Sequence, residues 1–148
     1  MKKQFKGRVV VKGSVNAEAL VSHGGFNTLA SYQHSLMFGD KSAKCSDQNN
    51  PDLYNKAMAG KALCLPQTIG STTGGLVLFC AASMKRQAAC LLFSKPIDSL
   101  AAAGTILADV WTDNSMPTID NLGDEFLSFV QSGDKITVTE EGLVIVER

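Results

Sequence analysis

One stretch, residues 61–80, constrains the fold more than any other part of the chain, and it reads KALCLPQTIGSTTGGLVLFC. Its apolar run at 62–65 is typical of a buried strand, which Pro66 ends because proline has no N–H to donate. Glycines and hydroxyl side chains fill 70–75, before a second apolar run at 76–82. We therefore predict a buried strand, a tight loop and a core helix that begins near Thr72.

The chemistry of this junction has two interpretations. A helix that begins here points its unpaired N–H groups and its positive dipole end at neighbouring hydroxyls. Such a helix start can hold an anion or stabilise an alkoxide at Ser71. The local pattern by itself favours the alternative, an ordinary N-capping serine in a glycine turn. The loop lacks the Gly-Lys-Ser/Thr of nucleotide-binding loops and the Gly-x-Ser-x-Gly of hydrolases, so neither of those motifs applies.

The composition is that of a globular chain with one core. Of its 148 residues, 45% are apolar and 19% charged, and 14 acidic side chains balance 14 basic ones. This balance argues against a nucleic acid or an anionic membrane as partner. The first apolar run, 9–11, is too short for a secretory signal, and the best apolar stretch, 74–82, is about half the length of a bilayer span. We expect a single domain in the cytoplasm.

The cysteines and histidines do not form a recognisable metal motif. The four cysteines are far apart in the sequence, without a Cys-x-x-Cys or a histidine at ligand spacing: Cys45, Cys64, Cys80 and Cys90. Three of them lie in apolar runs, where a buried, reduced thiol is usual. We therefore expect neither a disulfide nor a metal site in this chain. His23 and His34 lie at the two ends of a polar segment, where histidines are commonly solvated, and the sequence assigns no role to them or to Cys45.

The remaining pattern predicts a mixed α/β layout. An exposed loop is expected at 22–35, and a loop containing Pro117 at 112–121. The terminal strands 136–139 and 143–146 flank Glu140-Glu141-Gly142 as a hairpin. Further strands are predicted at 5–15, 17–21, 88–93 and 106–111. Two helices are also predicted, one that is capped by Asp98 or Ser99 and runs to about Thr105, and a short one at 124–130.

Several motifs taken together resemble the small, swivel-type subunit of the aconitase X family. The resemblance spans almost the whole chain and is densest at 47–75. It implies an α/β fold of the swivelling β/β/α type over residues 1–148, a sheet with helices on one side. The motifs that carry it are Asp47-Gln-Asn-Asn-Pro-Asp-Leu-Tyr, Ala59-Gly-Lys, Leu65-Pro and Gly70-Ser-Thr-Thr-Gly, with Gly7-Arg8-Val9, Ala19-Leu20-Val21-Ser22, Lys95-Pro-Ile-Asp98, Gly133-Asp134-Lys-Ile-Thr-Val138 and Glu141-Gly142-Leu-Val144.

This resemblance implies a hydro-lyase subunit that is active only with a large subunit. In such enzymes the swivel domain closes over a partner that holds an iron–sulfur cluster, and it supplies a serine base, which matches Ser71 here. The iron polarises the departing hydroxyl while the base removes the proton alpha to a carboxylate. Because this chain lacks clustered cysteines, the cluster is expected on the large subunit. The implied substrate-binding residues are Gly70, Thr72, Thr73, Gly74, Asp47 and Asn50.

The roles of three residues near the site have a structural alternative. Asp47 and Asn50 either line the mouth of the site or cap a loop, and Tyr54 either joins them there or lies in the core. Family members dehydrate cis-3-hydroxy-L-proline or, in archaea, mevalonate 5-phosphate. Archaeal members carry a Ser-Phe-Trp-Gly-Gly-type segment where this chain has residues 23–31, which favours hydroxyproline or a related hydroxy acid here. A non-catalytic binding module is the remaining alternative, because a fold does not fix a function.

Overall fold

The computed structural model describes all of residues 1–148 and contains ten strands and four helices. Eight strands form one sheet in the order β1-β10-β9-β3-β5-β7-β8-β2, and β4 pairs with β6. The strands are β1 (Lys2–Lys6), β2 (Arg8–Val11), β3 (Val15–Val21), β4 (Phe26–Asn27), β5 (Ala62–Leu65), β6 (Thr68–Ile69), β7 (Cys90–Phe93), β8 (Thr118–Asp120), β9 (Lys135–Val138) and β10 (Leu143–Glu147). The helices are α1 (Thr28–Phe38), α2 (Gly74–Ser83), α3 (Ser99–Trp111) and α4 (Asp124–Phe129).

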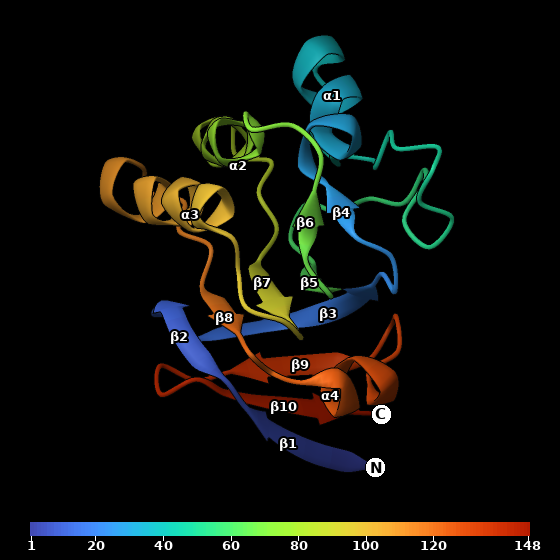
Figure 1. Ribbon diagram of the computed structural model, residues 1–148, viewed down its shortest axis with the longest axis vertical. Helices are drawn as coiled ribbons and strands as arrows, with labels where there is room; N and C mark the ends of the chain where they lie inside the picture. The colour runs from blue at the N-terminus through green and yellow to red at the C-terminus, as the bar shows by residue number, and fades with distance from the viewer.

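The sheet has an antiparallel half and a parallel half that share β3. β3 pairs antiparallel with β9 on one side and parallel with β5 on the other. β5, β7 and β8 continue the parallel half, and the predicted terminal hairpin is present as β9 and β10. In Figure 1, α1, α2 and α3 lie together above the parallel half, and the antiparallel half lies below it.

The central strand β5 explains why the fold has three layers. All four of its residues are buried, as the apolar run predicts. Because side chains alternate along a strand, Leu63 and Leu65 belong to the core under the helices, while Ala62 and Cys64 belong to the core between the two halves of the sheet. A strand buried on both faces therefore separates a helical layer from a second layer of strands.

One continuous segment connects the two halves at their far edges. β1 and β2 follow each other across Gly7 yet stand at opposite ends of the strand order. A Cβ at Gly7 would lie 2.4 Å from the carbonyl oxygen of Asp120, so only glycine fits this crossing. Beyond it, Arg8 Nε and Nη2 donate to the fully buried Asp120 carboxylate at 2.9 and 2.6 Å. The predicted single strand at 5–15 is thus two strands.

The prediction of a loop at 22–35 is wrong for most of that range, because α1 occupies Thr28–Phe38. The Asn27 side chain accepts a hydrogen bond from the Ala30 N–H at 3.1 Å, which caps the start of the helix. Gly39, at a φ of 77°, ends it in the left-handed conformation. Its buried residues include Thr28, Ser31 and Ser35, whereas Met37 and Phe38 are exposed. The apolar spacing is therefore weak, and only these two capping residues could have indicated the helix.

The prediction of a strand at 106–111 is also wrong, because α3 runs unbroken from Ser99 to Trp111. Gly104 does not end the helix but allows it to touch α2. A Cβ on Gly104 would lie 2.3 Å from the Gly75 carbonyl oxygen, and one on Gly75 would lie 2.1 Å from that of Leu100. Close packing of two helices therefore overrides the β propensity of the residues that follow.

Two smaller differences concern element boundaries. The core helix begins at Gly74 instead of near Thr72, and the strand β8 lies inside the segment 112–121 that was expected to be a loop. Of the two predicted caps, Asp98 and Ser99, the structure has Asp98, because its Oδ2 accepts the Ala101 N–H at 3.0 Å. The predicted short helix at 124–130 is present as α4, whose Phe126 ring meets Phe5 of β1 edge-on at 5.3 Å.

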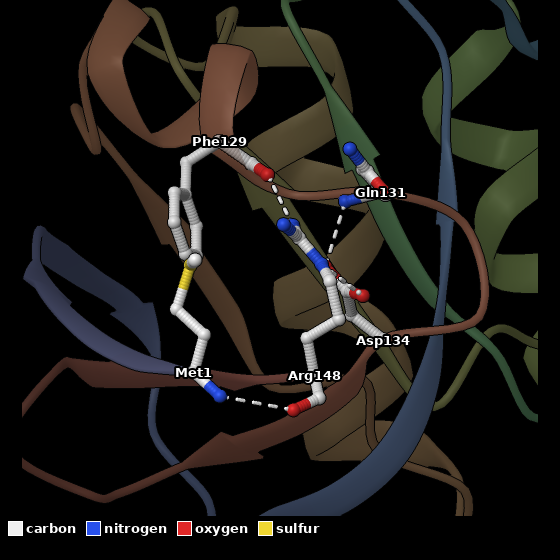
Figure 2. Close-up of polar contacts among 5 residues, drawn as sticks. All are labelled: Met1, Phe129, Gln131, Asp134 and Arg148. Atoms are coloured by element: carbon white, nitrogen blue, oxygen red, sulfur yellow. Dashed lines mark hydrogen bonds and ion pairs between the residues drawn. The ribbon is translucent and has the colours of Figure 1, made fainter.

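Polar contacts around Asp134 hold the C-terminal strand to the end of α4. Figure 2 shows Arg148 between Asp134 and the carbonyl of Phe129. Arg148 Nε and Nη2 donate to the two carboxylate oxygens at 3.0 and 2.9 Å, and the Gln131 N–H donates to the same group at 2.8 Å. Its hydrogen bond from Arg148 lowers the pKa of Asp134, against the opposing effect of burial.

We expect Asp134→Asn to lower the free energy of unfolding by about 1–2 kcal/mol at pH 7. Because the pKa of Asp134 is lower in the folded state, its contribution is complete above the unfolded-state pKa of about 3.9 and is lost as pH falls through the folded value. The difference from wild type should therefore shrink below about pH 4 in urea titrations.

The matched control for this test is Glu125→Gln. Glu125 pairs with Lys3, but both side chains are well exposed, so this variant should change stability little at either pH. A wild-type advantage over Asp134→Asn that stays constant from pH 7 to pH 3 would contradict the assignment.

Candidate functional site

A cavity of about 220 Å³ lies where α2 and α3 begin. Each helix follows one of two parallel neighbours, β5 and β7, so both helix starts meet at the same edge of the sheet. Sites of α/β proteins are commonly found outside this edge, beyond the carboxyl ends of the strands. The lining residues are Thr28, Thr68, Ile69, Gly70, Ser71, Gly74, Gly75, Asp98, Leu100 and Ala101.

Ser71 lies exposed at this cavity, three residues before α2. Its Oγ accepts the Thr73 N–H at 3.2 Å and is 2.8 Å from the Thr73 hydroxyl oxygen. The N-cap of α2 is Thr73, whose side chain makes no capping hydrogen bond. Ser71 is therefore not the helix cap, and its hydroxyl lies beside the positive end of the helix with the Thr73 N–H directed at it and the Thr73 hydroxyl within hydrogen-bond distance.

The turn that presents Ser71 depends on Gly70. Gly70 has a φ of 96°, which disfavours any residue with a Cβ, and that Cβ would lie 2.8 Å from the side chain of Asn27. Asn27 is the residue that caps α1, so the starts of three helices surround the Ser71 loop. Of the predicted site residues, Gly70, Ser71 and Gly74 line the cavity, whereas Thr72 and Thr73 do not.

Three polar residues that line the cavity were not predicted as site residues: Thr28, Thr68 and Asp98. Thr68, in the short strand β6, donates a hydrogen bond to Oδ1 of Asp98, which also caps α3. The Asp98 carboxylate therefore lies in the same cavity as Ser71. The predicted strand–helix order could have indicated this, because residues that follow neighbouring parallel strands meet at one edge of the sheet.

Asp47 and Asn50 line a neighbouring cavity of about 310 Å³ that shares Ile69 with the first. Both residues are buried, and their side chains already have partners within the chain. Asp47 Oδ1 accepts the Asn49 N–H at 3.0 Å, and Asn50 Nδ2 donates to the Ser22 hydroxyl at 3.1 Å. These contacts hold the loop in shape. Tyr54 is 42% exposed and lines neither cavity.

The thiols and imidazoles of the chain lie away from the Ser71 cavity. All four cysteines are free, and burial raises the pKa of the Cys90 thiol to about 12 and the pKa values of Cys45 and Cys64 in the same direction. The structure contains no group of three or more His, Cys, Asp or Glu side chains placed to hold a metal ion. No helix is long and apolar enough to cross a bilayer. His23 is exposed, and the His34 ring lies 5.0 Å from that of Phe38.

Comparison with known proteins gives consistent matches along the whole chain. The profile of the aconitase X swivel domain matches residues 4–146. Two curated relatives are phosphomevalonate dehydratase small subunits. The protein from Methanocaldococcus jannaschii is 28% identical, and the match covers 91% of this chain and 90% of the relative. The protein from Thermococcus onnurineus is 27% identical, and the match covers 97% of this chain and 98% of the relative.

Solved structures confirm the expected swivel-type α/β fold. The crystal structure of aconitase X from Thermococcus kodakaraensis in its holo form superposes with a TM-score of 0.81 at 23% identity, covering 99% of both chains. The solution NMR structure of a UPF0107 protein superposes with a TM-score of 0.79 at 22% identity, covering 99% of this chain and all of that one.

Proposed function

This chain belongs to the aconitase X swivel domain family, and we propose that it is the small subunit of a hydro-lyase that dehydrates a hydroxy acid with a large subunit. Curated relatives of nearly the same length are dehydratase small subunits, which supports this assignment. The observation that carries it is the position of Ser71, exposed in a cavity at the start of α2. Residues 1–148 would act as one swivel unit, in the cytoplasm.

We propose Ser71 as the base that removes the proton alpha to the substrate carboxylate. A free serine hydroxyl is a very poor base, so it has to react as an alkoxide that donors and a positive potential stabilise. The Thr73 N–H and hydroxyl lie within hydrogen-bond distance of Ser71 Oγ, and α2 adds its dipole. A cation from the partner would lower the cost of the alkoxide further.

The neighbouring residues are proposed to bind the substrate. Backbone groups of Gly70 and Gly74 line the cavity at the helix start, where a carboxylate is favoured. Thr72 and Thr73 follow Ser71 in the same loop, and their hydroxyls are proposed to bind the substrate carboxylate. Asp47 and Asn50 line the adjoining cavity. The thiols of this chain do not suit an iron–sulfur cluster, since no three ligating side chains converge. The cluster that the family implies would be held by the large subunit.

Two substrates remain candidates. The relatives named for phosphomevalonate favour mevalonate 5-phosphate. The Asp98 carboxylate in the Ser71 cavity favours cis-3-hydroxy-L-proline, because a carboxylate attracts the ring ammonium of an amino acid, a group that mevalonate 5-phosphate lacks. We propose the hydroxyproline, or a related hydroxy acid, as the substrate. A non-catalytic swivel-type binding module is the alternative to both.

The test is an anaerobic dehydration assay on this chain co-expressed with a large subunit of the same family. We expect turnover of cis-3-hydroxy-L-proline and little or none of mevalonate 5-phosphate. Turnover of the phosphate alone would correct the substrate and keep the reaction class. An assembled, cluster-loaded complex that dehydrates neither compound would favour the binding module.

A further inference from the structure

Helices α2 and α3 expose apolar side chains on the side that faces away from the sheet. On α3, Val110 is 65% exposed and Trp111 70%, and Leu76 on α2 is 60% exposed. Figure 1 shows the two helices side by side, with no other element over their outer side. We call the set Leu76, Leu100, Ile106, Val110 and Trp111 the apolar helix face.

The spacing of these residues shows that α3 has a second apolar side. Its buried side includes Ala101, Thr105 and Ala108, which lie against the core. The exposed residues Ile106 and Val110 lie one turn apart on the opposite side, and Leu100 and Trp111, three turns apart, lie on the flank next to Gly104, which contacts α2. α2 carries no charged side chain and α3 only Asp109, whereas a helix facing water normally has a polar outer side.

An aromatic pair makes the far end of this face well defined. The rings of Phe79 and Trp111 meet edge-on with centroids 6.2 Å apart, so α2 holds the exposed indole of α3 in place. Leu76 lies one turn before Phe79 on α2. An exposed tryptophan fixed by a neighbouring ring is typical of the anchors that dominate protein–protein interfaces.

The other end of the face adjoins the Ser71 cavity. Leu100 belongs to both, because it lines the cavity and lies in the first turn of α3. From there the face follows α3 to Trp111, about 20 Å for a 13-residue helix. A protein that closes over the cavity would therefore continue directly onto this face.

We propose that the apolar helix face is a docking surface for an apolar, uncharged patch of the large subunit. This inference rests on the proposed function, which supplies a subunit that must reach the Ser71 cavity. A second copy of this chain fits less well, since a copy seated on Leu100 would cover the cavity mouth. A large subunit seated on this face would bury it and complete the site at the same time.

The test compares the affinities of Val110→Asp and Met37→Asp for the purified large subunit. Val110 and Met37 are both 65% exposed on helices, but Met37 lies on α1, away from the apolar helix face. Val110→Asp should weaken assembly about 30-fold or more, because it places a charge in an apolar contact, while Met37→Asp should leave it within about threefold. Melting temperatures of the free variants verify that both are folded.

Three results would overturn the proposal. One is a Val110→Asp affinity within threefold of wild type, and another is an equal loss in both variants. The third is a concentration-dependent dimer of this chain that only Val110→Asp abolishes, which would assign the face to a second copy. Dehydration is measured separately on the wild-type complex: an inactive complex whose assembly still requires Val110 would remove the proposed function and keep the docking surface.

Discussion

Ser71→Ala is expected to lower the turnover of the assembled enzyme about 100-fold or more, because a positioned base contributes at least that factor. Folding should be affected far less, by about 1 kcal/mol or under, since the hydroxyl of Ser71 accepts one backbone hydrogen bond from Thr73 and caps no helix. Turnover and melting temperature are to be measured on the same assembled variant.

The comparison variant is Thr72→Val, in the same loop. If the Thr72 hydroxyl only helps to hold the substrate carboxylate, this change should raise KM and leave kcat nearly unchanged. A purely structural role for Ser71 predicts a modest loss of stability with nearly normal turnover. Ser71→Ala retaining more than about a tenth of wild-type turnover would reject the base, because that loss is under about 1.4 kcal/mol of barrier.

Among substitutions that add a single methyl group in this part of the chain, Gly75→Ala should be the most destabilising. Its Cβ would lie 2.1 Å from the carbonyl oxygen of Leu100, a backbone atom that cannot move aside without separating α2 from α3. We expect a loss of about 3 kcal/mol in the free energy of unfolding, measured by urea titration. Because both helices border the Ser71 cavity, activity should fall as well.

Gly74→Ala is the matched control, one residue earlier in the same helix. Its Cβ would meet the Thr28 side chain at 3.5 Å, an ordinary van der Waals contact. Since alanine is the better helix former, this change should be neutral or slightly stabilising. If the two variants have equal stability, the contact between Gly75 and Gly104 is not what sets the distance between the helices.

The sequence predicted the parts of the fold that depend on local pattern. The fully apolar strand β5, the Asp98 cap and the terminal hairpin were all found from spacing and turn residues. The family resemblance supplied the swivel architecture, which periodicity alone does not contain. Fold and family are confirmed by the comparisons.

The errors occur where tertiary contacts decide. The end of α3 carries residues of high β propensity, but contact with α2 through Gly104 keeps it helical. α1 has little apolar spacing, and it is stabilised in part by Arg86, a residue far away in the sequence. Arg86 donates a hydrogen bond of 2.7 Å to the Ser35 carbonyl. A window of sequence around either helix contains no sign of these partners.

The site was predicted in part for the same reason. Ser71 with its glycines forms a local motif and could be read directly. Thr68 and Asp98 reach the cavity from separate segments, so their place there follows only from the parallel pairing of β5 with β7. The catalytic role of Ser71 and the binding roles of its neighbours stay predictions.

The central claim is that this chain completes an active site on a large subunit. The most direct measurement adds increasing amounts of this chain to the purified, cluster-loaded large subunit and records the initial rate of dehydration under nitrogen. The account predicts no turnover by either chain alone and a rate that rises to a plateau as the chain is added, with wild type but not with Ser71→Ala. A large subunit that works equally fast without this chain would contradict it.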